Sequence, residues 1–444
     1  MQGKSTVDQM DMLLKRHQNW TGSKRIRKSF PKGGLTDMAS GMRGDDAQQR
    51  RRLFLKTALA GTGTMLLGGC VGSNLGSYPG NQIQPEAQPQ ISGEVIGSGS
   101  VRIGLLLPLA STSTDASVGT VFKNAAALAL QNFPSADLQL LVKDTGGTAT
   151  GGRAAAQAAI SEGAELILGP VFSAAVSGAA QAARSSGVPV IAFSTDTSVA
   201  SRGIYLLSFL PEGNVKRIIG YANSQRKSSY AALIPESPYG AVVEAAFRQE
   251  VGRGSGRIAT IQRYKQNGSD TSDLVAKTSA LTSVLNNIDA LFVPAGGSAP
   301  STVVQTLVGQ GADFGRIKLL GTGQWDVGQI KSNPALAGAW FAGPEDQNFT
   351  TFAQQYQKTY GSGPPRNASL AYDGVTLCAG LVRAAGQQRF QQNILTNRDG
   401  FIGIDGLFRF QSNGLNQRGL AVFQLTGAGV QVISPAPRDF RSGF

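Results

Sequence analysis

Short apolar runs alternate with helical patterns from residue 101 onward. The first stretch predicts strands at 101–107, 138–143, 166–168 and 188–193, and helices at 118–132, 151–162 and 174–185. Each helix stands between two strands, and this β-α-β alternation predicts a parallel sheet with helices on both faces.

The same rhythm starts again after Pro211. Here the pattern predicts helices at 214–224, 239–251, 274–286 and 301–310, and strands at 230–234, 258–264, 290–294 and 318–321. The chain from residue 100 onward has about 345 residues, a length that suits two domains. We therefore expect two consecutive α/β units of similar size.

The pattern changes after Trp340, where two helices are expected at 349–360 and 368–384. Strands are then expected at 406–410 and 419–425, with Asn413-Gly414 between them. Asn-Gly between two alternating strands is a strong hairpin signal, since both residues tolerate positive φ.

The N-terminal part carries an export pattern. Arg51 and Arg52, followed by Leu53, match a twin-arginine signal, which is completed by Phe54, Leu55 and Lys56. The weakly apolar run 57–69 is too short to cross a bilayer, which needs about 20 residues. Residues 67–70, Leu-Gly-Gly-Cys, resemble a lipobox, so Cys70 is the predicted lipidation site. An ordinary secretory signal with paired arginines is the alternative.

Two segments flank this signal. Residues 1–69 would form an N-terminal extension plus signal peptide, longer than the usual 15–30 residues. Met38 or Met42 is therefore an alternative start to Met1. Residues 70–99 are rich in Gly, Ser, Gln, Pro and Asn, and we expect a lipidated flexible tether. The body would be held at a membrane on the periplasmic side, and the sequence does not say which membrane.

The net charge of the chain after the predicted signal is modest and indicates little about its partners. The chain has a net charge of +13, and residues 1–69, with 13 basic and 5 acidic residues, hold +8 of it. No later block of Lys and Arg is interleaved with aromatics, so nucleic acid is not expected as a partner.

Histidine and cysteine are too scarce for several kinds of chemistry. The single histidine, His17, lies in the segment expected to be removed. Ser-His-Asp catalysis and His-ligated metal sites are thereby excluded, and no cofactor motif is found. Cys378 stands in an apolar helical pattern without a partner thiol, which favours a buried, inert side chain. We expect a protein that is not an enzyme.

Segments spread over residues 101–434 resemble the leucine/isoleucine/valine-binding proteins. The resemblance rests on the opening strand 101–109, the segments 167–173 and 187–191, Tyr239-Gly240, and the late segments 371–375 and 406–414. It implies the type I periplasmic binding fold: two α/β lobes, each with a largely parallel sheet, joined by three crossings around a ligand cleft. The crossings are expected near 208–211, 342–345 and 401–405.

The lobes expected from this resemblance are discontinuous in sequence. The first lobe would comprise 100–210 and 343–403, and the second 211–342 and 404–434, with 435–444 as a tail. A branch of lipid-anchored activators of penicillin-binding proteins has the same fold.

The resemblance also implies ligand residues. Ser173 matches a hydroxyl that holds the ligand carboxylate, and it is also expected to cap the helix that begins at Ala174. Asp196 departs from the pattern, because a carboxylate there would repel a ligand carboxylate; alternatively it caps the next turn, and Thr195 or Thr197 faces the ligand. The remaining candidates are Ser194 in the first lobe and, in the second, Tyr239, Gln324 and Trp325, with Asp326 as a substitute acid if the loop is longer.

Two functions remain open. The first is a solute-binding lipoprotein that binds an amino acid or similar small polar solute and delivers it to an ABC transporter permease. The alternative is a non-catalytic envelope regulator that activates a peptidoglycan synthase, which the incomplete amino-acid clamp favours. Fold alone does not separate them, since function depends on the site.

Overall fold

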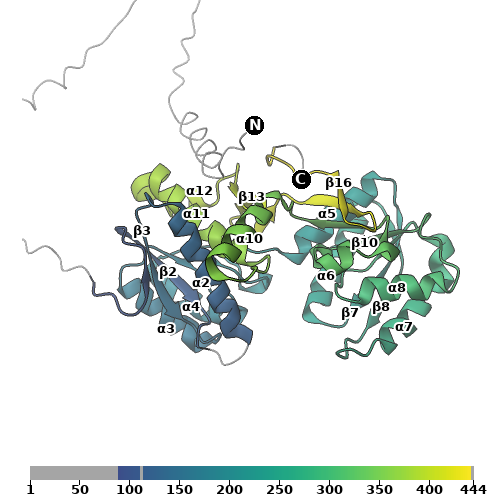
Figure 1. The fold of residues 1–444 in the computed structure, drawn as a ribbon, viewed down its shortest axis with the longest axis horizontal. Coiled ribbons are helices and arrows are strands. Elements are labelled where there is room, and N and C mark those ends of the chain that lie inside the picture. The colour runs from purple at the N-terminus through teal and green to yellow at the C-terminus, as the bar shows by residue number, and fades with distance from the viewer. Residues whose placement is uncertain (1–88, 111–113, 442–444) are drawn as a thin grey trace, which may run out of the picture. The chain divides into compact units, whose positions relative to one another are not determined.

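The computed structural model describes residues 89–110 and 114–441 (Figure 1). The predicted signal and lipidation residues, Arg51 to Lys56 and Cys70, lie outside these ranges. Two large sheets, one of six and one of seven strands, each carry helices on both faces, as the strand-helix alternation predicts. We call the six-stranded sheet with its helices the first lobe and the seven-stranded sheet with its helices the second lobe.

The first sheet has the strand order β1-β3-β2-β4-β5-β6. Its strands are β1 (Val95–Ile96), β2 (Val101–Leu107), β3 (Leu138–Asp144), β4 (Leu166–Leu168), β5 (Val190–Ala192) and β6 (Ile204–Leu206). All neighbours pair in parallel except β1, which is antiparallel to β3. The predicted tether therefore ends earlier than residue 99, because β1 is part of this sheet.

Alternation along β2 divides the first lobe into two cores. Ile103 and Leu105 face one layer of helices, whereas Leu106 faces the other. The helices on the first face are α2 (Thr114–Asn132), α10 (Gln347–Tyr360), α11 (Ala368–Ala385) and the short α12 (Gln392–Leu395). On the second face lie α3 (Ala149–Ser161) and α4 (Ser173–Ser186).

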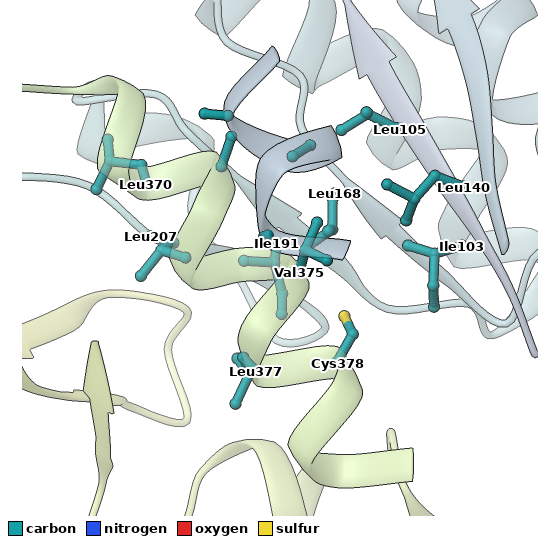
Figure 2. Packing of buried hydrophobic residues seen from close by; sticks show 14 of the residues in the cluster. Ile103, Leu105, Leu140, Leu168, Ile191, Leu207, Leu370, Val375, Leu377 and Cys378 are labelled. Atoms are coloured by element: carbon teal, nitrogen blue, oxygen red, sulfur yellow. The ribbon is translucent and has the colours of Figure 1, made fainter. Parts of the chain in front are cut away.

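The late helix α11 is nearly surrounded by this core. Figure 2 shows Val375 and Cys378 of α11 among the side chains that rise from the sheet. Cys378 is 0% exposed, and burial raises the pKa of its thiol. The expected buried thiol is thus present in the structure.

The second sheet has the order β16-β15-β11-β10-β9-β7-β8. Its strands are β7 (Ser229–Pro235), β8 (Arg257–Tyr264), β9 (Ala290–Phe292), β10 (Lys318–Gly321), β11 (Trp340–Gly343), β15 (Ala421–Leu425) and β16 (Val430–Ser434). Helices α5 (Pro211–Ser224) and α6 (Pro238–Arg253) cover one face. The other face is covered by α7 (Ser272–Ser279) and α8 (Ala299–Val308), with the short α9 (Gly328–Lys331) beside them.

The third crossing differs from the prediction. Strands β12 (Phe401–Gly403), β13 (Gly406–Phe410) and β14 (Asn416–Arg418) form a separate antiparallel sheet. Phe401, Phe408 and Phe410 are buried in the core of the first lobe. The chain therefore joins the second sheet only after Arg418, where β15 begins at Ala421, and not near residues 401–405. Asn413-Gly414 does form the hairpin turn, but its second strand is β14.

Candidate functional site

The candidate residues follow the carboxyl ends of neighbouring parallel strands. In the first sheet β4 and β5 are adjacent, and the loops after them hold Ser173 and the segment 194–196. In the second sheet β7, β9 and β10 are adjacent, and Tyr239 and Gln324 follow the first and last of them. Ligands of open α/β sheets bind at this edge, because the connecting loops and helix N-termini converge there.

Ser173 and Asp196 are brought together by the adjacent strands. Ser173 is the first residue of α4, and the N-cap is Phe172, whose side chain makes no capping bond. The expected N-cap role of Ser173 is therefore wrong. Its hydroxyl instead lies near the Asp196 carboxylate and helps to lower the pKa of Asp196.

Asp196 is an exposed carboxylate that caps a turn. Its Oδ1 accepts from the backbone N of Ser198 at 3.0 Å and from the Ser198 hydroxyl at 2.6 Å. These two bonds, with a smaller contribution from the nearby Ser173 hydroxyl, hold the pKa of Asp196 below its ordinary value. The capping alternative for Asp196 is confirmed. Because the acid is ionised at neutral pH, it gives the edge of the first sheet a negative charge.

The two other first-lobe candidates differ in exposure. Ser194 is buried, and its Oγ accepts from the backbone N of Asp196 at 3.1 Å, so it shapes the loop. Thr195 is exposed beside it. Thr197, the next hydroxyl, donates to Glu212 Oε1 at 3.3 Å. Thr195 is thus the hydroxyl in this loop that is most available to a solute.

Tyr239 is held on the second lobe by a polar pair. Its hydroxyl lies 2.9 Å from Thr322 Oγ1 and donates to Pro294 O at 3.2 Å. Burial raises the pKa of Tyr239 to about 12, so the phenol is neutral. Sequence reasoning missed Thr322, although its place directly after β10 was the signal that could have found it.

Gln324 and Trp325 lie in the same turn but differ in exposure. Gln324 is exposed and offers an amide at the strand edge. Trp325 is 0% exposed, and its Nε1 donates to Ala295 O at 2.9 Å within the core of the second lobe. Trp325, a candidate ligand residue from the sequence, is therefore not available to a solute in this structure; its indole lies inward against Gly321, where a Cβ would leave no room for the ring.

Asp326, the expected substitute acid, is already paired. Its Oδ2 accepts from Arg366 Nη1 at 2.8 Å, and its Oδ1 accepts from Lys331 Nζ at 2.8 Å. Arg366 also binds Asp405 and Asp346. Since two cations neutralise Asp326, it is not free to receive a ligand ammonium.

Residues 89–110 and 114–441 contain neither a candidate membrane span nor a candidate metal site. No helix in these ranges is long and apolar enough to cross a membrane. No group of three or more His, Cys, Asp or Glu side chains in them is arranged to hold a metal ion.

The family profile described as periplasmic binding protein matches residues 100–429, which is most of the chain. The chain belongs to the periplasmic binding protein family. Such binding proteins bind small solutes outside the cytoplasm and deliver them to ABC transporter permeases. No curated protein matches the sequence.

Solved structures support the type I periplasmic binding fold. A structure described as a branched-chain amino acid ABC transporter from Rhodospirillum rubrum is 18% identical, with a TM-score of 0.66, covering 75% of this chain and 99% of that one. The substrate-binding protein LivJ from Streptococcus pneumoniae, in complex with isoleucine, is 18% identical with a TM-score of 0.54, covering 76% and 99%. A solute-binding protein from Rhodopseudomonas palustris, in complex with 3,4-dihydroxybenzoic acid, is 18% identical with a TM-score of 0.54, covering 76% and 98%.

Proposed function

We propose that this periplasmic binding protein is a lipoprotein, anchored through Cys70, that binds an amino acid or a similar small polar solute for import by an ABC transporter. The observation that carries the proposal is the placement of Ser173 and Asp196 directly after the adjacent parallel strands β4 and β5, at the same edge of the sheet. Polar side chains gathered at this edge are what a solute site in such a fold requires.

The negative charge of this edge limits the kinds of solute that could bind there. An ionised Asp196 repels a carboxylate and attracts an ammonium group or a strong hydrogen-bond donor. Thr195 adds a hydroxyl, and on the second lobe Gln324 adds an amide that both donates and accepts. The solute we propose therefore presents a cationic or hydroxyl-rich end to the first lobe, the reverse of the carboxylate orientation that the family resemblance implies.

A thermal-shift screen tests this proposal. We expect one class of amine, polyol or amino acid to raise the melting temperature, since a ligand that binds only the folded state stabilises it. Asp196→Asn keeps a side-chain oxygen for the cap but removes the charge, and it should weaken binding of a cationic solute about tenfold. The matched control is Asp313→Asn, which alters a similar turn on the second lobe, where Asp313 Oδ1 accepts from Gly315 N at 2.8 Å. Absence of any shift across the panel would count against solute binding.

The second candidate is the envelope regulator. It is favoured by the state of the second lobe, where Asp326 is neutralised by Lys331 and Arg366, and Trp325 is buried. No acidic partner for an amino-acid ammonium is then free among these residues. Under this alternative the chain binds and stimulates a peptidoglycan synthase without a small solute. A pull-down and a synthase activity assay with the purified chain would decide, and failure of both would remove this candidate.

A further inference from the structure

The structure contains a cavity whose lining does not include Thr195, Asp196 or Gln324, the residues proposed to bind the solute. This cavity of about 1330 Å³ is bounded by α5 and α6, by the β13–β14 hairpin and by the segment after β16. Of the residues named as possible solute contacts, only Thr197, the alternative to Thr195, lines it. Six basic side chains do line it: Lys216, Arg217, Arg253, Arg398, Arg409 and Arg418.

The cavity has more positive charge than its own carboxylates can neutralise. Only Glu212 and Glu250 line it, and Glu250 pairs with Arg253 at 2.7 Å. Arg418 faces the buried acids Asp373 and Asp405 behind the hairpin. The other four basic side chains form no ion pair with a carboxylate in the described part of the chain. Half-buried charges are normally paired, so the unpaired Lys216, Arg217 and Arg409 call for an anion from outside, and the exposed Arg398 adds to the positive charge.

Arg217 is fixed in place by neutral acceptors. Its Nε donates to Leu420 O at 2.7 Å, and its Nη2 donates to Ser434 Oγ at 2.7 Å. Nη1 has no acceptor among the described residues. Burial lowers the pKa of Arg217, as expected for a guanidinium that is desolvated without a counterion. The side chain is therefore preorganised, with one edge of its fork unused.

Arg409, in β13, is also held by neutral acceptors, and its Nη1 donates to the Arg398 carbonyl at 3.0 Å. Its Nη2 donates to Gln417 Oε1 at 2.7 Å, and its guanidinium lies 4.2 Å from the Phe440 ring centre. Burial, and then the neighbouring charge of Arg398, lower the pKa of Arg409. Two cations side by side repel each other, and a bound anion would relieve that repulsion.

We propose that this cavity binds a phosphate-bearing anion. Four unpaired cations match a ligand with more than one negative charge, and the planar guanidinium fork suits phosphate oxygens in a bidentate geometry. The volume exceeds that of a phosphate group, so the rest of the ligand also enters. The phosphate belongs either to a free solute or to a lipid headgroup, and the experiment distinguishes these two sources.

Calorimetric titration of the purified full chain with inorganic pyrophosphate tests the free source. Sedimentation with phosphatidylglycerol vesicles, against phosphatidylcholine vesicles, tests the lipid source in a Cys70→Ala background. The test variant is Lys216→Gln/Arg398→Gln, because neither side chain makes a bond that the fold needs. The matched control is Lys277→Gln/Arg153→Gln, which removes one Lys and one Arg elsewhere on the surface.

We expect saturable binding in one of the two arms, weakened about tenfold in the test variant and unchanged in the control. Added salt should also weaken this binding, since salt screens partly exposed charges. The proposal is overturned if neither pyrophosphate nor phosphatidylglycerol binds, or if the test and control variants bind equally. Because the readout does not involve Asp196 or Gln324, its failure would leave the solute-binding proposal untouched.

Discussion

Replacing Arg366 by Met removes the centre of a buried ionic cluster. Arg366 Nη2 lies 2.8 Å from Asp405 Oδ1, and its Nη1 donates to Asp326 Oδ2 at 2.8 Å. It also binds Asp346 and donates to the Glu345 carbonyl at 2.9 Å. One side chain thus ties the loop after β10, the segment before α10 and the loop after β12.

The loss of stability in Arg366→Met depends on which partners each carboxylate retains. Lys331 still pairs with Asp326 at 2.8 Å and with Asp346 at 3.1 Å, so these two acids are partly compensated. The Asp405 side chain is 0% exposed and keeps only the Ser369 hydroxyl as a hydrogen-bond donor, with Arg418 as the nearest remaining charge. Removing one partner of a buried pair costs about 3–5 kcal/mol.

Urea denaturation followed by circular dichroism measures this loss. Arg248→Met is the control, because Arg248 is 52% exposed and its partner Glu244 keeps Arg263, so it should cost less than about 1 kcal/mol. The double variant Arg366→Met/Asp405→Asn should recover part of the loss, since no uncompensated buried carboxylate remains at residue 405. Equal midpoints for Arg366→Met and Arg248→Met would refute the reasoning.

Three further outcomes are expected. Gly321→Ala places a Cβ 2.2 Å from the Trp325 ring and should lower the free energy of unfolding by about 1–3 kcal/mol. In Gly220→Ala, in α5, the new Cβ has nothing within 4 Å, so this variant should raise the free energy of unfolding by about 0.5–1 kcal/mol. The midpoints of urea denaturation check both values. Burial raises the pKa of Asp373 from 3.8 to about 7, so its contribution to stability is fully present below pH 3.8 and is lost as the pH rises through 7. Melting temperatures measured between pH 4 and 8 should therefore fall less steeply in Asp373→Asn. Cys378, 0% exposed, should react with a thiol reagent only after unfolding, and rapid reaction of the native chain would contradict its burial.

Local pattern was sufficient to predict most elements. Strands 101–107, 166–168 and 318–321 were predicted with the bounds that the structure has, because continuous apolar runs of a buried parallel strand end sharply at Gly or Pro. Among the described residues, six strands were missed: β1, β6, β12, β14 and β16, which lie at sheet edges, and the four-residue β11 within the second sheet. An edge strand has little apolar pattern of its own, since its position depends on the neighbour that it pairs with.

The sequence predicted which loops carry the candidate site residues, but not the role of each side chain within them. Strand order brings Ser173 and Asp196 to one edge, which supports the loops chosen from the sequence. The roles within them depended on packing: the indole of Trp325 lies in the core, and Asp326 is claimed by Lys331 and Arg366. Arg366 is 40 residues from Asp326 in sequence, and no periodicity marks that pairing.

The sequence by itself determined the two-sheet architecture and the helix-covered strands, because apolar periodicity and turn residues act over a few positions. The family followed from the resemblance of particular segments, such as 167–173 and 371–375. Only the tertiary structure decided which polar groups are free. Charge pairing across distant loops neutralises Asp326 and leaves Arg217 and Arg409 without a carboxylate. Those pairings depend on how strands and crossings meet in space, which the order of residues along the chain does not display.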